Sequence, residues 1–345
     1  MSDLIDNSIA NPGSMGWGDE HDSAETRHAN EQRNFAALAE AAPTWVMRHE
    51  AKEPSQRILK ALQDEMAKDG ITGGFSARYI ELVVFGAFFA WLAQIIGSCV
   101  ASGGMRALTR RTLIEIFLLG QAEETFGHQI TGVDNVAPFG PYSYRAGRRF
   151  TNIRGDGSYC SIHTRGAMTY GMLPCSAAGL QSDAFPEPQS ASLYRQWGAS
   201  NSLMDQFQSL AKKFLLLESE NIRDADDSKT ALREHYKPQM ICSNWAFRPD
   251  YAHPTWKDRN GNPIIIYKRD TSTSWSHNMT VDGQIVAVEK DWTLIDNSWG
   301  PKAHKNGSFF IIPFSLFGDW TRSAEIQTIG DIDLTDSATP LSEPA

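Results

Sequence analysis

The chain has 345 residues, of which 41% are hydrophobic and 10% aromatic, enough to bury a sizeable core in one large or two small domains. Its formal net charge of −9 argues against general nucleic-acid binding through a surface that neutralises phosphates. We therefore expect a globular protein without a nucleic-acid partner.

The first 30 residues are mostly polar and carry few apolar side chains, which predicts an extended or disordered arm over 1–30. This arm is either a solvated tail or a segment that docks onto a protein partner, with Met15 and Trp17 as its anchors. Its acidic start lacks the basic-then-apolar pattern of a secretion signal. A cytoplasmic location, or one inside a protein assembly such as a virion, is therefore expected.

An N-terminal helical segment is expected over 31–75. Its clearest helix is amphipathic, begins at Pro54 and runs to about Lys68, because Asp69-Gly70 supplies a helix stop.

The apolar run Leu82–Ala101 is about as long as the roughly 20 residues that span a bilayer. Because Gly86 and Gly97 interrupt it, we favour a buried β segment and turn followed by a buried helix, so membrane insertion is not expected. That helix should start at Cys99 and run to about Leu119.

The middle of the chain alternates between loops and helices. Residues 131–158 are loop-like, and Ser158 is predicted to cap a helix over Tyr159–Tyr170 that ends at Gly171. Beyond it we expect a helix, a charged loop, a short helix and a strand, at Leu203–Ser219, Asp224–Lys229, Ala231–Tyr236 and Met240–Ser243.

The last third predicts β structure, with strands separated by turns. Asp282-Gly283 and Asn306-Gly307 are dipeptides typical of hairpin turns. An antiparallel sheet or barrel should carry His277 and Asn297 on neighbouring strands. A loose tail is expected over 331–345.

The four cysteines show neither a Cys-x-x-Cys pair nor histidines at metal spacing, so no metal site and no cofactor is expected. Their even number permits two disulfides, but reduced thiols are favoured without a secretion signal. Cys160, Cys175 and Cys242 are expected to be structural.

The remaining cysteine has partners for chemistry elsewhere in the chain. Cys99 supplies a thiol, His277 an imidazole, Asn297 an amide that can orient the imidazole, and Gln94 a second amide near the thiol. A thiolate is a strong nucleophile, and an imidazole can stabilise it and later protonate a leaving amine. These residues are the parts of a Cys-His-Asn nucleophilic site.

The order Gln94, Cys99, His277, Asn297, with the motif Asn297-Ser-Trp-Gly300 and the later block Asn306–Ile311, resembles the papain-like cysteine peptidase family. The resemblance is strongest over 239–314 and also covers the Cys99 block. It implies an α+β fold in which a helical lobe carries the nucleophile at the N-terminus of a central helix. That helix packs against an antiparallel β-sheet or barrel lobe.

The same resemblance implies a papain-like domain over 76–330, with an insertion near 185–230. In its terms Cys99 is the nucleophile, His277 the acid–base group, and Gln94 an oxyanion donor. Trp299 would shield the contact between His277 and Asn297.

A substrate edge is also implied by the resemblance, at Gly155, Gly157 and Ser158, which would pair with the substrate backbone. The alternative is that these glycines serve a tight turn.

The sequence departs from the family pattern at three places. Gln94 precedes Cys99 by one position fewer than expected, Val100 replaces an aromatic residue, and Pro301–Lys305 replaces a second Trp-Gly. The first hypothesis is a cysteine peptidase or amidase that hydrolyses peptide or protein substrates through a thioester. The second is a structural or interaction protein that uses this fold inside a larger assembly, and the third is a membrane-anchored protein.

Overall fold

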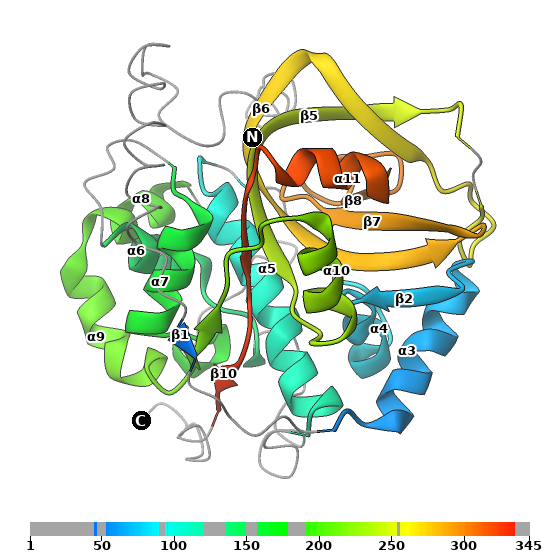
Figure 1. Cartoon of the computed structure of the whole chain (residues 1–345). Helices are drawn as coiled ribbons and strands as arrows, with labels where there is room; N and C mark the ends of the chain where they lie inside the picture. The colour runs from blue at the N-terminus through cyan, green and yellow to red at the C-terminus, as the bar shows by residue number, and fades with distance from the viewer. Residues whose placement is uncertain are drawn as a thin grey trace.

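The computed structural model describes the backbone of residues 45–46 and residues 53–89, 94, 96–120, 135–149, 157–178, 191–253 and 256–334. Two lobes lie on either side of the central helix α5 (Cys99–Leu113), helices on one side and a sheet on the other (Figure 1). The predicted α+β class is confirmed. The predicted arm over 1–30, with Met15 and Trp17, and the candidate substrate residue Gly155 lie outside the described residues.

The sheet lobe contains six strands in the order β7-β8-β6-β5-β9, with β2 paired to β6. Its strands are β2 (Gly73–Ser76), β5 (Gln239–Asp250), β6 (Ile266–Ala287), β7 (Lys290–Asp296), β8 (Phe309–Pro313) and β9 (Glu325–Thr328). Pairing is antiparallel except where Ile266 of β6 meets Ile311 of β8. Because β6, β7 and β8 each pair with the other two, this end of the sheet closes on itself.

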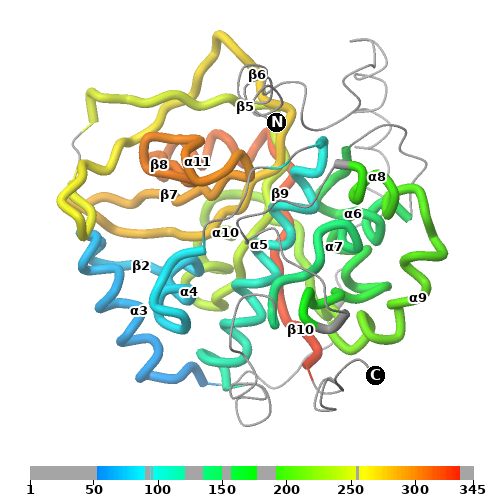
Figure 2. Tube along the Cα trace, turned by 180° about the vertical axis from the view of Figure 1, so that it is seen from behind, coloured from blue at the N-terminus to red at the C-terminus, as the bar shows by residue number. Residues whose placement is uncertain are grey.

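The central helix is buried along its whole length, as the sequence predicts for a helix between two lobes. It continues into a π-helical turn over Ile114–Leu118, so the predicted end near Leu119 is confirmed. Both views place α5 in the middle of the molecule (Figures 1 and 2).

The helical lobe consists of α6 (Gly140–Arg148), α7 (Cys160–Tyr170), α8 (Ala191–Ala199) and α9 (Asn201–Ala211). The predicted cap at Ser158 is wrong: the N-cap of α7 is Tyr159, whose side chain makes no capping hydrogen bond. The predicted end of α7 at Gly171 is confirmed, and the positive φ of 78° there suits a residue without Cβ.

Helices α3 (Gln56–Lys68), α4 (Tyr79–Phe85), α10 (Ala225–Arg233) and α11 (Phe314–Thr321) accompany the sheet lobe (Figure 1). The predicted limits of α3 are confirmed, because Ser55 caps its start and Asp69 follows its end. Two short antiparallel strand pairs lie outside this sheet. In one, β1 (Trp45–Val46) pairs with β4 (Glu218–Ser219), and in the other, β3 (Leu215–Leu216) pairs with β10 (Ile332–Asp333). The expected loose tail thus begins with a paired strand, and 335–345 lie outside the described residues.

Several local predictions are wrong. The segment 131–158, expected to be loop-like, contains α6, and the β segment expected from Leu82 onward lies in α4 where it begins. The segment 31–75, expected to be helical, contains β1 and most of β2. The helix predicted over Leu203–Ser219 ends at Ala211 and gives way to β3 and β4. The charged loop predicted over Asp224–Lys229 is the start of α10, because Asp224 caps it. The hairpin predicted at Asp282-Gly283 is a bulge inside β6, where the register with β7 shifts.

The β6–β7 hairpin turns instead at two residues, Val288 and Glu289, with φ of 44° and 61°. Positive φ at both positions is what a two-residue turn between twisted strands requires, even without glycine. In the apolar run near residue 82, α4 ends at Phe85 and Gly86 takes the left-handed conformation. No helix among the described residues is long and apolar enough to cross a membrane.

Candidate active site

The sheet brings the imidazole and the amide of the predicted site together. His277 lies in β6 and Asn297 directly follows β7, which pairs with β6 up to Asp296. The Nε2 atom of His277 is 2.7 Å from Oδ1 of Asn297, and both side chains are fully buried. The amide therefore accepts a hydrogen bond from the ring, and Nδ1 of a neutral His277 carries the free lone pair.

The other half of the Asn297 amide is also engaged. Its Nδ2 lies 2.8 Å from Nε2 of His304, a half-buried residue enclosed by aromatic rings. Since an amide nitrogen only donates, His304 accepts this bond. Sequence reasoning missed His304, although it lies in the segment Pro301–Lys305 that departs from the family pattern.

Trp299 lies against this group. Its ring stacks on the His277 imidazole, with centroids 4.5 Å apart and planes 24° from parallel. Trp275 and Trp299 pack in an edge-to-face arrangement, with their ring centroids 4.7 Å apart. These rings exclude water from one side of the bond between His277 and Asn297, where a polar contact is stronger.

His277 is a neutral imidazole in this structure. Burial lowers its pKa to about 3, while the hydrogen bond to Asn297 acts in the opposite direction. Its Nδ1 is buried and has no hydrogen-bond partner among the described residues. The ring thus holds an unoccupied acceptor inside the site.

Cys99 is the first residue of α5, where free backbone amides and the positive end of the helix dipole favour a thiolate. The thiol is nevertheless fully buried, and burial, followed by the proximity of Cys242, raises its pKa to about 12. Within the described part of the chain no hydrogen bond joins this thiol to His277. Burial thus favours the protonated thiol of Cys99 and the neutral imidazole of His277.

Gln94 is tied to the asparagine motif rather than left free. Its backbone N–H donates to the Ser298 carbonyl at 2.8 Å, and the Ser298 hydroxyl donates to its side-chain oxygen. The side-chain Nε2 of Gln94 donates to the Ile96 carbonyl at 3.3 Å. Ser298, a second residue that sequence reasoning missed, thus joins the segment before Cys99 to the loop that carries Asn297.

Arg106 makes a further connection that the sequence does not reveal. It lies in α5, two turns after Cys99, and is buried. Its guanidinium donates to the Asn297 carbonyl and, at 3.1 Å, to the Asp296 carboxylate. One buried arginine therefore fixes the asparagine loop to the helix that begins with the thiol.

The predicted substrate edge is described only in part. The Gly157 carbonyl accepts a hydrogen bond from Arg148, and the buried Ser158 hydroxyl has no partner among the described residues. Gly155 lies outside the described part.

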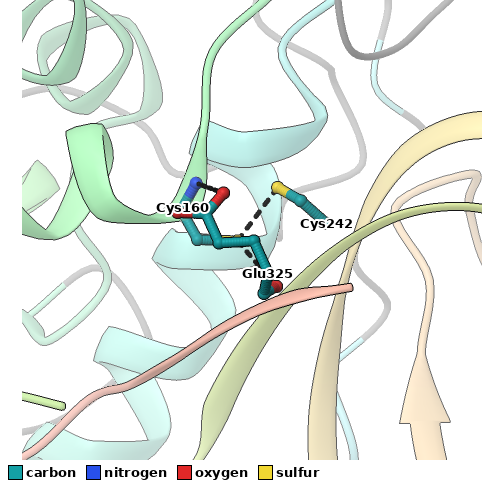
Figure 3. A group of neighbouring side chains, drawn as sticks. All are labelled: Cys160, Cys242 and Glu325. Carbon is teal, nitrogen blue, oxygen red and sulfur yellow. Dashed lines mark hydrogen bonds between the residues drawn. The ribbon is translucent and has the colours of Figure 1, made fainter. Parts of the chain in front are cut away.

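Two of the other cysteines belong to a group of side chains that could hold a metal ion. Donor atoms of Cys160, Cys242 and Glu325 lie within 4.8 Å of one another, and all three residues are buried (Figure 3).

No protein-family model matches the sequence, and a search of curated proteins finds no significant match. Solved structures do resemble the fold. Xylellain, a cysteine protease from Xylella fastidiosa, is 14% identical with a TM-score of 0.46, covering 84% of this chain and 94% of its own. Procathepsin B S9 from Trypanosoma congolense is 9% identical with a TM-score of 0.45, covering 96% and 98%. The proform of the ragweed pollen cysteine protease Amb a 11 is 11% identical with a TM-score of 0.43, covering 96% of each chain.

Proposed function

We propose that this chain is a papain-like thiol hydrolase that cleaves peptide or other amide bonds with Cys99, His277 and Asn297. The observation that carries the proposal is the imidazole geometry. His277 Nε2 is held by Asn297 at 2.7 Å beneath Trp299, and Nδ1 remains available as a base. An orienting partner on one ring nitrogen and a free acceptor on the other are what a general base for a nucleophile requires.

The proposed reaction begins when Nδ1 of His277 takes the proton of the Cys99 thiol. The thiolate attacks the amide carbonyl carbon, and the negative charge develops on its oxygen at the N-terminal end of α5. The imidazolium then protonates the leaving amine, which leaves a thioester on Cys99. Water, deprotonated by His277, hydrolyses the thioester and restores the thiol.

Gln94 would assist as an oxyanion donor. Its carbonyl oxygen is bound by Ser298, which fixes the orientation of the amide, while Nε2 is bound to the Ile96 carbonyl. A substrate oxygen would replace that carbonyl as the acceptor. Losing one such donor typically lowers kcat by about 10²–10³.

A second candidate function is a structural or interaction protein that has this fold and little activity. The burial of Cys99 favours it, since a fully buried thiol with a pKa of about 12 is not poised for attack. The two functions differ in whether substrate binding exposes the thiol to its base.

Steady-state hydrolysis of a panel of fluorogenic peptidyl amides would test the proposal. Cys99→Ala and His277→Ala should each lower kcat by at least about 10³, whereas Cys175→Ser, at a buried cysteine outside the site, should retain turnover. Absence of turnover by the wild-type protein across the panel would favour the structural role.

A further inference from the structure

Two thiols meet where the lobes join. Cys160 is the first residue of α7 in the helical lobe, and Cys242 lies in β5 of the sheet lobe. Their Sγ atoms are 2.9 Å apart, and neither residue is exposed (Figure 3). Both are free thiols in this structure.

A hydrogen bond between two thiols stabilises the protein only slightly, because S–H is a weak donor and sulfur a weak acceptor. A disulfide bond places the same atoms about 2.05 Å apart, so the sulfurs need approach by only about 0.9 Å. We propose that Cys160 and Cys242 are an oxidation site, at which an intramolecular disulfide joins the helical lobe to the sheet lobe.

The surroundings already hold both sulfurs in place. Asn278 Nδ2 donates to Cys160 Sγ at 3.0 Å and to Cys242 Sγ at 3.2 Å. A disulfide sulfur keeps its lone pairs, so these contacts survive oxidation. The Glu325 carboxylate accepts from the backbone N–H groups of Cys160 and Ser161, at 3.2 and 2.7 Å, and so fixes the start of α7.

A metal ion fits the same cluster less well. In a tetrahedral zinc site with Zn–S bonds of about 2.3 Å, two sulfurs are about 3.8 Å apart. Binding would therefore push Cys160 and Cys242 away from each other. It would also draw Glu325 from the two backbone donors that it already satisfies.

The oxidation can be written with a small-molecule disulfide such as oxidised glutathione. Two S–H bonds of the protein and one S–S bond of the oxidant break, one protein S–S bond forms, and two reduced glutathiones leave with the protons and electrons. Burial raises the pKa of Cys160 well above its usual value, and only the thiolate exchanges. The exchange therefore belongs to folding or to an opened state, and the finished bond is protected from reductants.

The bond would connect residues 82 positions apart and constrain the unfolded chain accordingly. In the chain-entropy account a loop of this size gives a disulfide one of its larger stabilising effects. For a domain of this size we expect the oxidised protein to melt about 5–10 °C above the reduced protein. This inference does not depend on hydrolase activity.

The test is to refold the full chain in a glutathione redox buffer and alkylate the free thiols under denaturing conditions. Intact mass should show two alkylated cysteines in the oxidised protein and four after reduction. Peptide mapping should find one cross-linked species, which contains Cys160 and Cys242. This wild-type measurement needs no variant to fold.

Matched variants assign the stability effect. Cys160→Ser and Cys242→Ser should abolish the difference in melting temperature between oxidised and reduced protein, whereas Cys175→Ser should retain it. Four alkylated cysteines after oxidative refolding, or a cross-link between another pair such as Cys99 and Cys242, would overturn the inference. Protection of both thiols by added Zn²⁺ without a cross-link would also overturn it.

Discussion

At the scale of single residues, the candidate site depends on how one amide is oriented. Asn297 offers one acceptor and one donor side, and His277 and His304 occupy one each. If His304 accepts from Nδ2, the carbonyl side must face His277, which in turn must donate from Nε2. We therefore expect His304 to be a positioning residue that selects the tautomer of the proposed base, His277, from the far side of the amide.

Replacing His304 tests this chain of hydrogen bonds. His304→Leu removes the acceptor and should lower kcat by about 10-fold or more with little change in KM, because an unoriented base slows the chemical step. His304→Gln supplies an acceptor oxygen and should restore most of the rate.

A structural readout separates positioning from packing. NMR of ¹⁵N-labelled imidazoles should show His277 protonated at Nε2 in wild type and His304→Gln, and a mixture of tautomers in His304→Leu. Equal Nε2 protonation in all three proteins would exclude the positioning role.

At the scale of elements, α5 is fixed to the sheet lobe by buried charges. Arg110 donates to Glu81 at 2.6 Å, to Asp296 at 2.7 Å and to Asp282, and all four residues are buried. Burial opposes the charge of Asp296, but Arg106 and Arg110 hold its pKa well below the usual range. The cluster thereby ties α4, β6 and β7 to the helix that starts at Cys99.

Removing the centre of this cluster should cost far more than removing a surface pair. Arg110→Met leaves three buried carboxylates without their shared partner and should lower the free energy of unfolding by about 3–5 kcal/mol. Arg322→Met, in an exposed pair with Asp319, should leave it nearly unchanged. Urea denaturation of both variants checks this, and equal effects would show that the cluster is not stabilising.

The start of α10 offers a second element-scale test. Asp224 accepts hydrogen bonds from the backbone N–H groups of Asp226 and Asp227, at 2.9 Å each. Asp224→Ala should lower the free energy of unfolding by about 1 kcal/mol, and Asp224→Asn by much less, because asparagine caps helices nearly as well. Equal losses in urea denaturation would mean that charge, rather than capping, matters there.

The sequence predicted elements best where local pattern and packing agree. The limits of α3 follow from Ser55 and Asp69-Gly70, whereas the start of α5 at Cys99 is what the resemblance to papain-like peptidases implies. At Asp282-Gly283 the sequence predicts a turn, but the structure has a continuous strand. Pairing of β6 with β2 and β7 outweighs the local turn preference there.

Pairing far along the chain explains the other differences as well. Leu215–Leu216 leaves the helical pattern because it pairs with Ile332–Asp333, more than a hundred residues later. In the site, order and motif predicted the approach of His277 to Asn297. The contributions of Arg106, Ser298 and His304 depend on contacts between distant segments, which no local pattern reveals.

At the scale of the whole molecule, buried neutral histidines make stability depend on pH. Burial alone lowers the pKa of His163 to about 4, from 6.5 in an unfolded chain. Between these pH values the unfolded state binds a proton at His163 that the folded state does not. The contribution of His163 to the free energy of unfolding is therefore fully present above pH 6.5 and is lost as the pH falls toward 4.

His163→Gln should make this loss smaller. Relative to its own value at pH 8, the variant should lose about 3 kcal/mol less than wild type by pH 4, since other titrating groups are shared. Urea denaturation at a series of pH values gives the comparison. Parallel pH profiles would show that folding does not lower the pKa of His163.

Labelling with a peptidyl epoxide that traps papain-like thiols would show whether His277 activates Cys99 as a nucleophile. Intact mass and peptide mapping of wild type and His277→Ala should show stoichiometric modification at Cys99 that is lost in the variant. No labelling, or equal labelling of all four cysteines, would mean that Cys99 is not activated and would favour the structural role.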